Sequence, residues 1–330
     1  MNLKIENIRD ATSNEWDEIW QQCDYATYFH SREWAEIWNV YTKNNIRPVP
    51  KLISFSDGKK ALLPLSLQPN YRGLVKTYLS SPAGTFGGWI DQDKLEIKHA
   101  ILLSNLLTKK MGNLCWRVNP YDELALKINI EISREDETHA LNLSNGFDTI
   151  YKEWTKGHSS AARKARKAGV FIRLASQLDD WQSYYRVYED SLNRWGEKAS
   201  NKYGRELFEE IFHRHSHSIR LWLAIYQEEI VAGALCFYAK RHVVYWHGAA
   251  LDKYFNLRPV NLLMYEIIKN ACEEKYLWFD FNPSGGHEGV KSFKKSFGAQ
   301  PLACPIINKN TMISRSLGIV SRMVKRFLPW

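Results

Sequence analysis

The chain is organised around the segment Tyr276-Leu-Trp-Phe-Asp-Phe-Asn-Pro-Ser-Gly-Gly-His-Glu-Gly-Val-Lys-Ser-Phe-Lys-Lys-Ser-Phe-Gly298. It opens with a short aromatic and apolar run, long enough for one buried strand, which carries a single carboxylate, Asp280, near its end. The run breaks at Asn282-Pro-Ser-Gly-Gly286, whose proline and glycines predict a loop. It resumes as a basic segment whose apolar residues recur at helical spacing: Val290, Phe293 and Phe297. We predict a strand, a glycine loop and a helix.

Polar residues follow the predicted strand closely. In alternating α/β sheets, the loops at the carboxyl ends of strands line the ligand crevice. We therefore expect one bound molecule to be faced by Asp280, Ser284, His287, Lys291 and Lys294. The alternative is that Asp280 caps the loop and the lysines form a solvated helix face, because short patterns of this kind are common.

Composition predicts a globular protein with an anionic partner. The chain has 330 residues, enough for two domains that each bury a core. Its hydrophobic content of 45% and aromatic content of 13% exclude a disordered chain. The net charge of +9 favours nucleic acid, a phosphorylated substrate or a membrane surface as partner.

Cysteine usage and hydropathy predict a cytoplasmic protein. Five cysteines stand singly in apolar segments without a Cys-x-x-Cys pair, which is typical of core thiols in a reducing compartment. The amino terminus lacks the apolar core of a signal peptide, and no apolar run approaches the ~20 residues of a membrane span. We expect a soluble protein or one that contacts the inner membrane peripherally.

Residues 1–146 are expected to form a first α/β domain. A helix begins after Thr12-Ser-Asn-Glu15, a capping pattern, and Ser56-Asp-Gly58 predicts a hairpin turn. The expected strands are 3–8, 49–55, 61–67, 114–118 and 140–143, and the expected helices begin at residues 13 and 31 and cover 95–107.

Residues 147–309 are expected to form a second domain on the same plan. The expected helices are 147–154, a basic alanine-rich helix at 159–168, one over 181–195, one around 207–212 and one from Pro259, a favoured first helical residue. The expected strands are 170–174, 221–226, 230–238, 243–250 and 276–281. Two segments share the pattern of strand, tight turn and strand, which predicts a duplicated domain. They are Ile53-Ser-Phe-Ser-Asp-Gly-Lys-Lys-Ala-Leu-Leu-Pro-Leu65 and Ala224-Ile-Tyr-Gln-Glu-Glu-Ile-Val-Ala-Gly-Ala-Leu-Cys236.

Several motifs together resemble one family. They are Tyr28-Phe-His-Ser-Arg-Glu-Trp34, Arg163-Lys-Ala-Arg-Lys-Ala-Gly-Val170, Ala232-Gly-Ala-Leu235, Arg258-Pro-Val-Asn-Leu-Leu263, and Phe279-Asp-Phe281 with Gly289, Phe293-Lys294 and Phe297-Gly298. This combination resembles the Fem-type branch of the GNAT acyltransferase superfamily. It is similar both to peptidoglycan-bridge aminoacyltransferases and to GNAT proteins of the cellulose-biosynthesis type.

The resemblance implies two tandem GNAT-like domains, each a mixed, largely antiparallel sheet flanked by helices. It implies transfer of an acyl or aminoacyl group to an amine, with acyl-CoA or aminoacyl-tRNA as co-substrate and no tightly bound cofactor. A GNAT domain usually cradles the CoA pyrophosphate on a glycine-containing loop at a helix amino terminus. Here that loop reads Phe255-Asn-Leu-Arg-Pro-Val-Asn261, so the resemblance leaves Arg258 and Asn261 to grip a phosphate.

Acyl transfer needs a held donor, a path for the amine's proton and hydrogen bonds for the oxyanion. Backbone N–H groups beside a splayed strand can supply the last. On the expected strand containing them, alternation places Tyr245 and His247 on one face and Trp246 on the other. Asp280, Tyr245 and His247 are the candidate proton-handling residues, and Asp280 is the strongest. Lys294 resembles the lysine of the family's Phe-Lys motif, which implies that it neutralises developing negative charge. For each residue the alternative is packing with a satisfied hydrogen bond.

Four cations surround the basic helix: Arg163, Lys164, Arg166 and Lys167. They leave only alanine for packing, which suits a polyanion such as tRNA or a phosphorylated acceptor, and the alternative is a solvated surface helix. Asn282 and Ser284 are further candidate substrate contacts. His213, His215 and His217 alternate, but no matching carboxylate or cysteine cluster accompanies them, so we expect no metal site.

Residues 310–330 form a basic tail with an apolar stripe, which favours a membrane interface over docking on the protein itself. The leading hypothesis is an amine acyltransferase acting on a cell-wall or surface-polysaccharide precursor, lipid-linked or nucleotide-linked, with the first domain on the acceptor side and the second on the donor side. The alternative is a non-catalytic polyanion-binding, nucleic-acid-binding or scaffold protein with the same fold.

Overall fold

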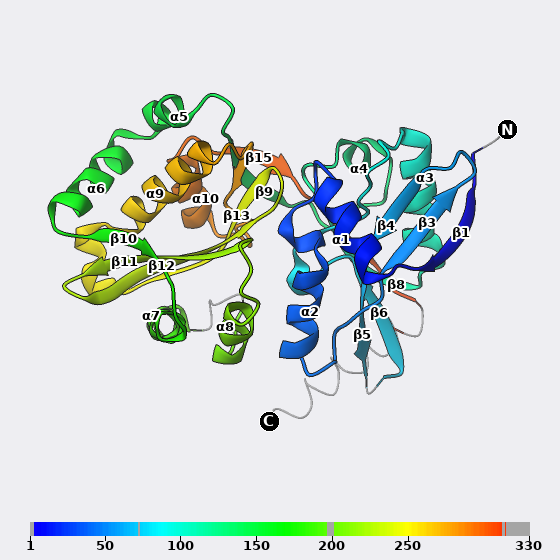
Figure 1. The fold of residues 1–330 in the computed structure, drawn as a ribbon, viewed down its shortest axis with the longest axis horizontal. Coiled ribbons are helices and arrows are strands. Elements are labelled where there is room, and N and C mark those ends of the chain that lie inside the picture. The colour runs from blue at the N-terminus through cyan, green and yellow to red at the C-terminus, as the bar shows by residue number, and fades with distance from the viewer. Residues whose placement is uncertain (1–2, 72, 197–200, 312–313, 315–330) are drawn as a thin grey trace. The chain divides into compact units, whose positions relative to one another are not determined.

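The computed structural model describes residues 3–71, 73–196, 201–311 and 314. The chain divides into two compact units, one of Met1–Asp136 with Ala303–Trp330 and one of Glu137–Leu302. Each unit combines β-sheet with flanking helices, two sheets in the first unit and one in the second (Figure 1). The prediction of two tandem α/β domains is confirmed. The expected tail segment lies outside the described residues from residue 312 onward, except for residue 314.

The first unit begins with strand, helix, helix and hairpin. Its helices are α1 (Ser13–Gln22), α2 (Arg32–Tyr41), α3 (Ile97–Asn105) and α4 (Glu123–Lys127). Its strands are β1 (Ile5–Asp10), β2 (Arg47–Pro48), β3 (Lys51–Phe55), β4 (Lys60–Leu63), β5 (Ser66–Asn70), β6 (Val75–Leu79), β7 (Phe86–Gly87), β8 (Asn113–Val118) and β16 (Ile306–Lys309). They form one sheet in the order β1-β3-β4 and a second in the order β16-β8-β6-β5-β2, with β7 beside β8.

Local sequence explains the start of the first unit. The Thr12 side chain accepts a hydrogen bond from the Glu15 backbone N–H while the Glu15 carboxylate accepts from the Thr12 backbone N–H, so the expected capping box opens α1. Tryptophans then fill the interior, among them Trp34, Trp89 and Trp116, each at most 1% exposed. Burying a large apolar side chain is worth about 1.5–3 kcal/mol, so these residues contribute strongly to the fold.

The second unit holds one seven-stranded sheet. Its order is β10-β11-β12-β13-β14-β9-β15. The strands are β9 (Glu137–Asn142), β10 (Phe171–Leu174), β11 (Ile219–Tyr226), β12 (Glu229–Tyr238), β13 (His242–Ala250), β14 (Trp278–Asp280) and β15 (Gln300–Ala303). The helices are α5 (Phe147–Glu153), α6 (Lys156–Lys167), α7 (Leu178–Trp195), α8 (Arg205–Phe212), α9 (Pro259–Glu273) and α10 (Glu288–Lys295).

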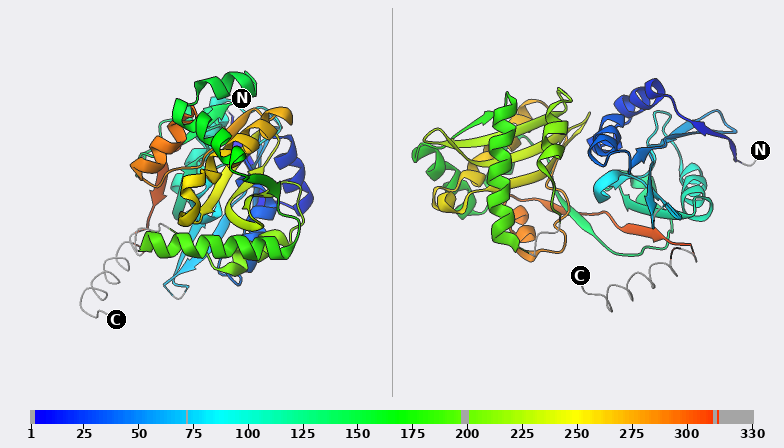
Figure 2. Two further views of the ribbon diagram at one scale, coloured as in Figure 1. Left: turned by 90° about the vertical axis from the view of Figure 1, so that its left-hand side faces the viewer. Right: turned by 90° about the horizontal axis from the view of Figure 1, so that it is seen from below.

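Helices cover both faces of this sheet. Helix α7 lies along one face with α8 beside it, and α9 packs on the other face with α6 against it (Figures 1 and 2). The alanines of α6, namely Ala161, Ala162 and Ala165, are buried, so small side chains let this helix lie close to α9 while its cations stay in solvent.

Element boundaries differ modestly from the expectations. The expected helix at 95–107 is α3 followed by a π-helical turn at Leu106–Lys110. The strand expected at 276–281 is shorter, and the strand expected at 140–143 is β9, which pairs antiparallel with β14. Because β14 pairs with β9, the end of β14 lies beside residues that are distant from it in the sequence.

Candidate active site

Strands β13 and β14 run parallel for only three pairs, of which the last is Val244 with Asp280. Strand β14 ends there, while β13 continues to Ala250. Beyond Val244, the described strands provide no second strand neighbour for β13 along residues Tyr245–Gly248. These four residues are partly exposed, although the rest of β13 is buried. We call this segment the β13 edge.

A β-bulge deforms the β13 edge. Cys236 pairs with Tyr245 and the preceding residue, Leu235, pairs with His247, so Trp246 is the extra residue. Residues directly opposite each other share a face, and Cys236 and Leu235 point to opposite faces. Tyr245 therefore lies on the α9 face and His247 on the α7 face. The expectation that both share one face is wrong, because alternation fails across a bulge.

Two predicted charged residues meet at Asn282. The Asp280 carboxylate accepts hydrogen bonds from the Asn282 backbone N–H at 2.6 Å and from the Thr138 hydroxyl at 2.5 Å. The Lys294 ammonium donates to the Asn282 carbonyl oxygen. Asp280 is 0% exposed and Lys294 is 3% exposed. Buried charges are tolerated when they are hydrogen-bonded in this way, and here they fix the left-handed conformation of Asn282.

The rest of the glycine loop is arranged differently. Ser284 is buried, and its hydroxyl has no hydrogen-bond partner among the described residues. His287 is exposed, and Lys291 forms ion pairs with Glu137 at 3.4 Å and with Glu288 at 3.3 Å. His287 and Lys291 therefore lie on the solvent side, whereas the buried Asp280 and Lys294 anchor the loop through the half-buried Asn282.

Burial controls the protonation of the β13 edge. His247 Nδ1 lies 2.7 Å from the Tyr184 hydroxyl, and burial lowers the pKa of His247 to about 3. The imidazole is therefore neutral at physiological pH. Burial also raises the pKa of Tyr245 well above its usual value, so this phenol keeps its proton. Gly248 leaves room for the phenol, because a Cβ there would lie 1.7 Å from the Tyr245 hydroxyl oxygen.

The amino terminus of α9 is uncapped by side chains. Pro259 is its first residue, and Arg258 before it adopts a left-handed conformation with φ of 59°. The Asn261 side chain forms a 2.8 Å hydrogen bond with His158 Nδ1. Burial, and secondarily the charge of Arg258, lowers the pKa of His158. A positive helix end with a cation beside it suits an anionic group.

The four cations of α6 are exposed, as expected for a polyanion-binding or solvated face. Arg166 differs from the others, because its guanidinium forms an ion pair with Glu266 at 2.7 Å and lies 4.9 Å from the centre of the Tyr265 ring. Arg163, Lys164 and Lys167 form no ion pair with the described residues.

Among its described residues, the first unit is arranged differently at the corresponding place. Its parallel pair, β6 and β8, ends at Leu79 with Cys115, and β7 then takes the place beside β8, with Phe86 opposite Arg117. Gly87 of β7 packs so closely on Ser80 that a Cβ would lie 2.3 Å from the serine hydroxyl oxygen. The chain itself therefore fills this position.

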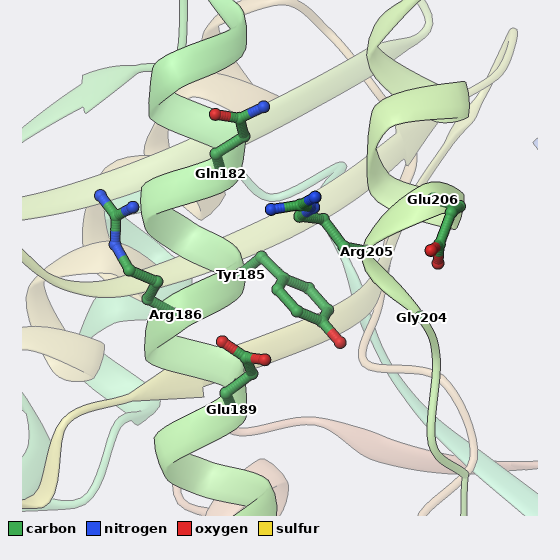
Figure 3. Close-up of a pocket in the computed structure, with 7 residues that line it drawn as sticks. All are labelled: Gln182, Tyr185, Arg186, Glu189, Gly204, Arg205 and Glu206. Atoms are coloured by element: carbon green, nitrogen blue, oxygen red, sulfur yellow. The ribbon is translucent and has the colours of Figure 1, made fainter.

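A polar hollow of about 570 Å³ lies between α7 and the start of α8. It is lined by Gln182, Tyr185, Arg186, Glu189, Gly204, Arg205 and Glu206. Tyr185 and Arg205 extend into the space between the two helices (Figure 3). The Tyr185 hydroxyl donates to the Tyr203 carbonyl oxygen, and the Tyr203 ring stacks on Trp246 of the β13 edge. The hollow thus lies on the face of the sheet that also carries His247.

Two residues of this arrangement carry no recognisable motif: Thr138 and His158. Each contacts a predicted residue more than a hundred positions away in sequence. Among the described residues, no group of three His, Cys, Asp or Glu side chains is placed to hold a metal ion. No helix in the described part of the chain is long and apolar enough to span a membrane.

Comparison with known proteins shows which proteins the chain resembles. Residues 155–295 match the family model described as an acetyltransferase (GNAT) domain. No curated protein matches the chain in a sequence comparison. Among solved structures, the chain is similar to FemX, with a TM-score of 0.70 and 13% identity over 91% of this chain and 97% of that chain.

It is also similar to L-PGS from Bacillus licheniformis, with a TM-score of 0.57 and 12% identity over 96% of this chain and 97% of that chain. A third similar structure is the C-terminal domain of a putative lysylphosphatidylglycerol synthetase from Agrobacterium fabrum, with a TM-score of 0.57, 10% identity and 94% coverage of each chain. Structural likeness at such identities shows the fold. Together with the domain match, it shows that residues 155–295 match a GNAT acetyltransferase domain within a chain that has the fold of FemX.

Proposed function

We propose that the second unit transfers an acyl or aminoacyl group, from acyl-CoA or aminoacyl-tRNA, to an amine on a cell-wall or surface-polysaccharide precursor. The observation that carries this proposal is the β13 edge, a partly exposed stretch of strand that extends beyond the end of its parallel neighbour β14 within a buried sheet. Its backbone N–H groups would donate hydrogen bonds to the carbonyl oxygen of the donor as that oxygen becomes negative.

The two faces of the sheet suggest where the two substrates bind. The phosphates of the donor would lie at the amino terminus of α9, held by Arg258 and Asn261 on the face that carries Tyr245. The amine would approach on the α7 face, beside His247. The hollow there offers Glu189 and Glu206, two carboxylates without an ion pair among the described residues, to an ammonium group.

The proposed reaction forms one C–N bond and breaks one C–S or C–O bond. The amine nitrogen attacks the carbonyl carbon, and the neutral His247 takes at Nε2 the proton that this nitrogen loses as the C–N bond forms, which requires the tautomer whose Nδ1–H donates to the Tyr184 oxygen. The tetrahedral intermediate then collapses and its C–S or C–O bond breaks. Tyr245 then gives its proton to the leaving thiolate or alkoxide. Asp280 and Lys294 act through Asn282 as positioning residues that hold the loop beside the reacting groups.

Two donors fit the exposed cations of α6. Acyl-CoA is the usual donor of a GNAT domain, and Arg163, Lys164 and Lys167 would contact its phosphates. Aminoacyl-tRNA would engage the same residues over a longer stretch. One structural relative is described as a putative lysylphosphatidylglycerol synthetase, whose name joins lysine to a lipid headgroup, and this supports testing aminoacyl donors.

Calorimetric titration with CoA and gel-shift with charged tRNA separate the two donors. We expect one of them to bind and Arg258→Ala to weaken that binding about tenfold or more, the scale of one charge-assisted contact. Lys109→Ala in the first unit removes an exposed cation and should leave binding unchanged. The proposal fails if neither donor binds, or if both variants bind equally well.

The second candidate is a polyanion-binding protein without catalysis, favoured by the exposed cations of α6. It predicts that Arg163→Glu abolishes function while Tyr245→Phe leaves it intact. Acyl transfer predicts that Tyr245→Phe slows turnover yet leaves donor binding unchanged. A single-turnover assay on both variants therefore decides between the two candidates.

A further inference from the structure

One end of the first unit exposes large apolar side chains. The β5–β6 hairpin pairs Asn70 with Val75 and therefore turns over residues 71–74. At this turn Tyr71 is 38% exposed and Leu74 is 76% exposed, the highest value for a large apolar residue in the described chain. Burial of a leucine side chain is favourable, so a turn that exposes one to water is suited to bury it against another surface.

A second apolar residue lies at the same end. Val40, in the last turn of α2, is 53% exposed. The chain then turns through Lys43 to β2, where Arg47 pairs with Leu67 of β5, so the turn after α2 is joined to the hairpin. The carboxyl end of α2 and the β5–β6 hairpin point to the same end of the unit (Figure 1). We call this the hairpin-end surface: Val40, Lys43, Arg47, Tyr71, Leu74 and Lys76.

The charge of this surface has one sign. The sequence contains no Asp or Glu between Glu36 and Asp57, nor between Asp57 and Asp91. Lys43, Arg47 and Lys76 are exposed and form no ion pair with the described residues. The elements that build this end therefore supply cations without compensating acids.

We infer that the hairpin-end surface docks on an anionic lipid bilayer. Leucine and tyrosine at a protruding turn suit the interface between headgroups and acyl chains, and each lysine or arginine near an anionic leaflet adds about 1 kcal/mol of attraction. A second copy of the chain fits less well, because self-contact would bring the same cations together. The docking is independent of acyl transfer and of the tail at residues 312–330.

The test is co-sedimentation of the full chain with vesicles of phosphatidylcholine alone or with about a third phosphatidylglycerol. We expect binding to the anionic vesicles only, and weaker binding at high salt because exposed charges are screened. Leu74→Asp should weaken binding about tenfold or more, the scale of losing one buried leucine. The double variant Lys43→Glu/Lys76→Glu should also weaken it strongly.

The matched control is Ile101→Asp, which places the same charge at a 47% exposed apolar residue of α3 and should bind as the parent does. Thermal unfolding verifies that the exposed substitutions leave the fold intact. The inference is overturned if the parent protein does not bind anionic vesicles. It is also overturned if Leu74→Asp binds them as well as the parent does, because another segment would then carry the binding. Light scattering that shows a dimer lost in Leu74→Asp, without vesicle binding, would also overturn it in favour of self-association.

Discussion

At the scale of single residues, Asn282 joins the two most unusual charges of the second unit. Its backbone N–H donates to the Asp280 carboxylate and its carbonyl oxygen accepts from the Lys294 ammonium, so the backbone of one residue holds both side chains in place. Neither charge is exposed to solvent. Their position therefore depends on every hydrogen bond around them, including the one from Thr138.

Removing the Thr138 hydroxyl tests this dependence. Thr138→Val keeps the shape of the side chain but leaves the buried Asp280 carboxylate with one donor fewer. We expect the free energy of unfolding to fall by about 1–3 kcal/mol, because a buried charged acceptor loses its partner. Chemical denaturation measures the change. Thr149→Val, at an exposed site on α5, is the control, and an equal effect of both would contradict a special role for Asp280.

The lowered pKa of His247 predicts that the folded protein becomes less stable in acid. Its pKa is about 3 in the folded chain and about 6.5 when unfolded, so the unfolded state binds a proton first as pH falls. Stability is fully present above about pH 6.5 and declines toward pH 3, by at most ~1.4 kcal/mol per pH unit from this residue. His247→Asn should flatten the decline in denaturation midpoint between these limits. His287→Asn, at an exposed histidine, should keep the parent's slope.

The sequence indicates some of these site residues and hides others. Asp280 and Lys294 stand in one recognisable stretch, so their proximity follows from a strand, a loop and a helix. Thr138 and His158 act from β9 and α6, and only the folded sheet brings them near. The opposite facing of Tyr245 and His247 follows from a bulge, which depends on strand register and leaves no trace in the alternation of side chains.

At the scale of elements, the two-residue strand β7 distinguishes the first unit from the second. It occupies the place beside β8, whereas in the second unit β13 extends beyond the end of its parallel neighbour β14. A strand this short has no periodicity to detect, so the repeated hairpin predicts two similar units without predicting that one edge is filled. The difference makes the second unit the better candidate for donor binding.

Gly87→Ala tests whether β7 is packed as tightly as its neighbours indicate. A Cβ would lie 2.6 Å from the Ser80 backbone, which cannot move aside as a flexible side chain can. We expect a loss of about 1–3 kcal/mol in the free energy of unfolding, the usual cost of overpacking. The same substitution at Gly157, within α6 and with open space around its Cβ, should instead stabilise by about 0.5–1 kcal/mol. Thermal unfolding measures both changes in stability. A loss of stability in Gly87→Ala with a gain in Gly157→Ala would support the close packing of β7, and changes of the same sign would contradict it.

At the scale of the whole molecule, the two units both combine sheet and helices but differ in the strand edges and surfaces that they expose. The second has a partly exposed strand that extends beyond its parallel neighbour, a helix terminus without a side-chain cap and a basic helix. In the first, β7 lies beside β8 and a hairpin end exposes apolar side chains. Composition predicts an anionic partner from the net charge of +9 but assigns it to no surface. The positions of the exposed cations in the structure assign the anionic partner to particular surfaces, because clustered cations without ion pairs attract an anion most strongly.

Charge reversal on the two units distinguishes a local site from a general attraction. Arg163→Glu/Lys167→Glu on α6 and Lys109→Glu/Lys110→Glu after α3 change the net charge equally, and all four side chains are exposed. If the donor engages α6, the first pair should weaken donor binding about tenfold or more and make its salt dependence shallower, since fewer phosphates are neutralised. The second pair should leave the salt slope unchanged. Titration at several salt concentrations measures both slopes, and parallel losses in the two variants would mean that net charge alone, rather than α6, attracts the donor.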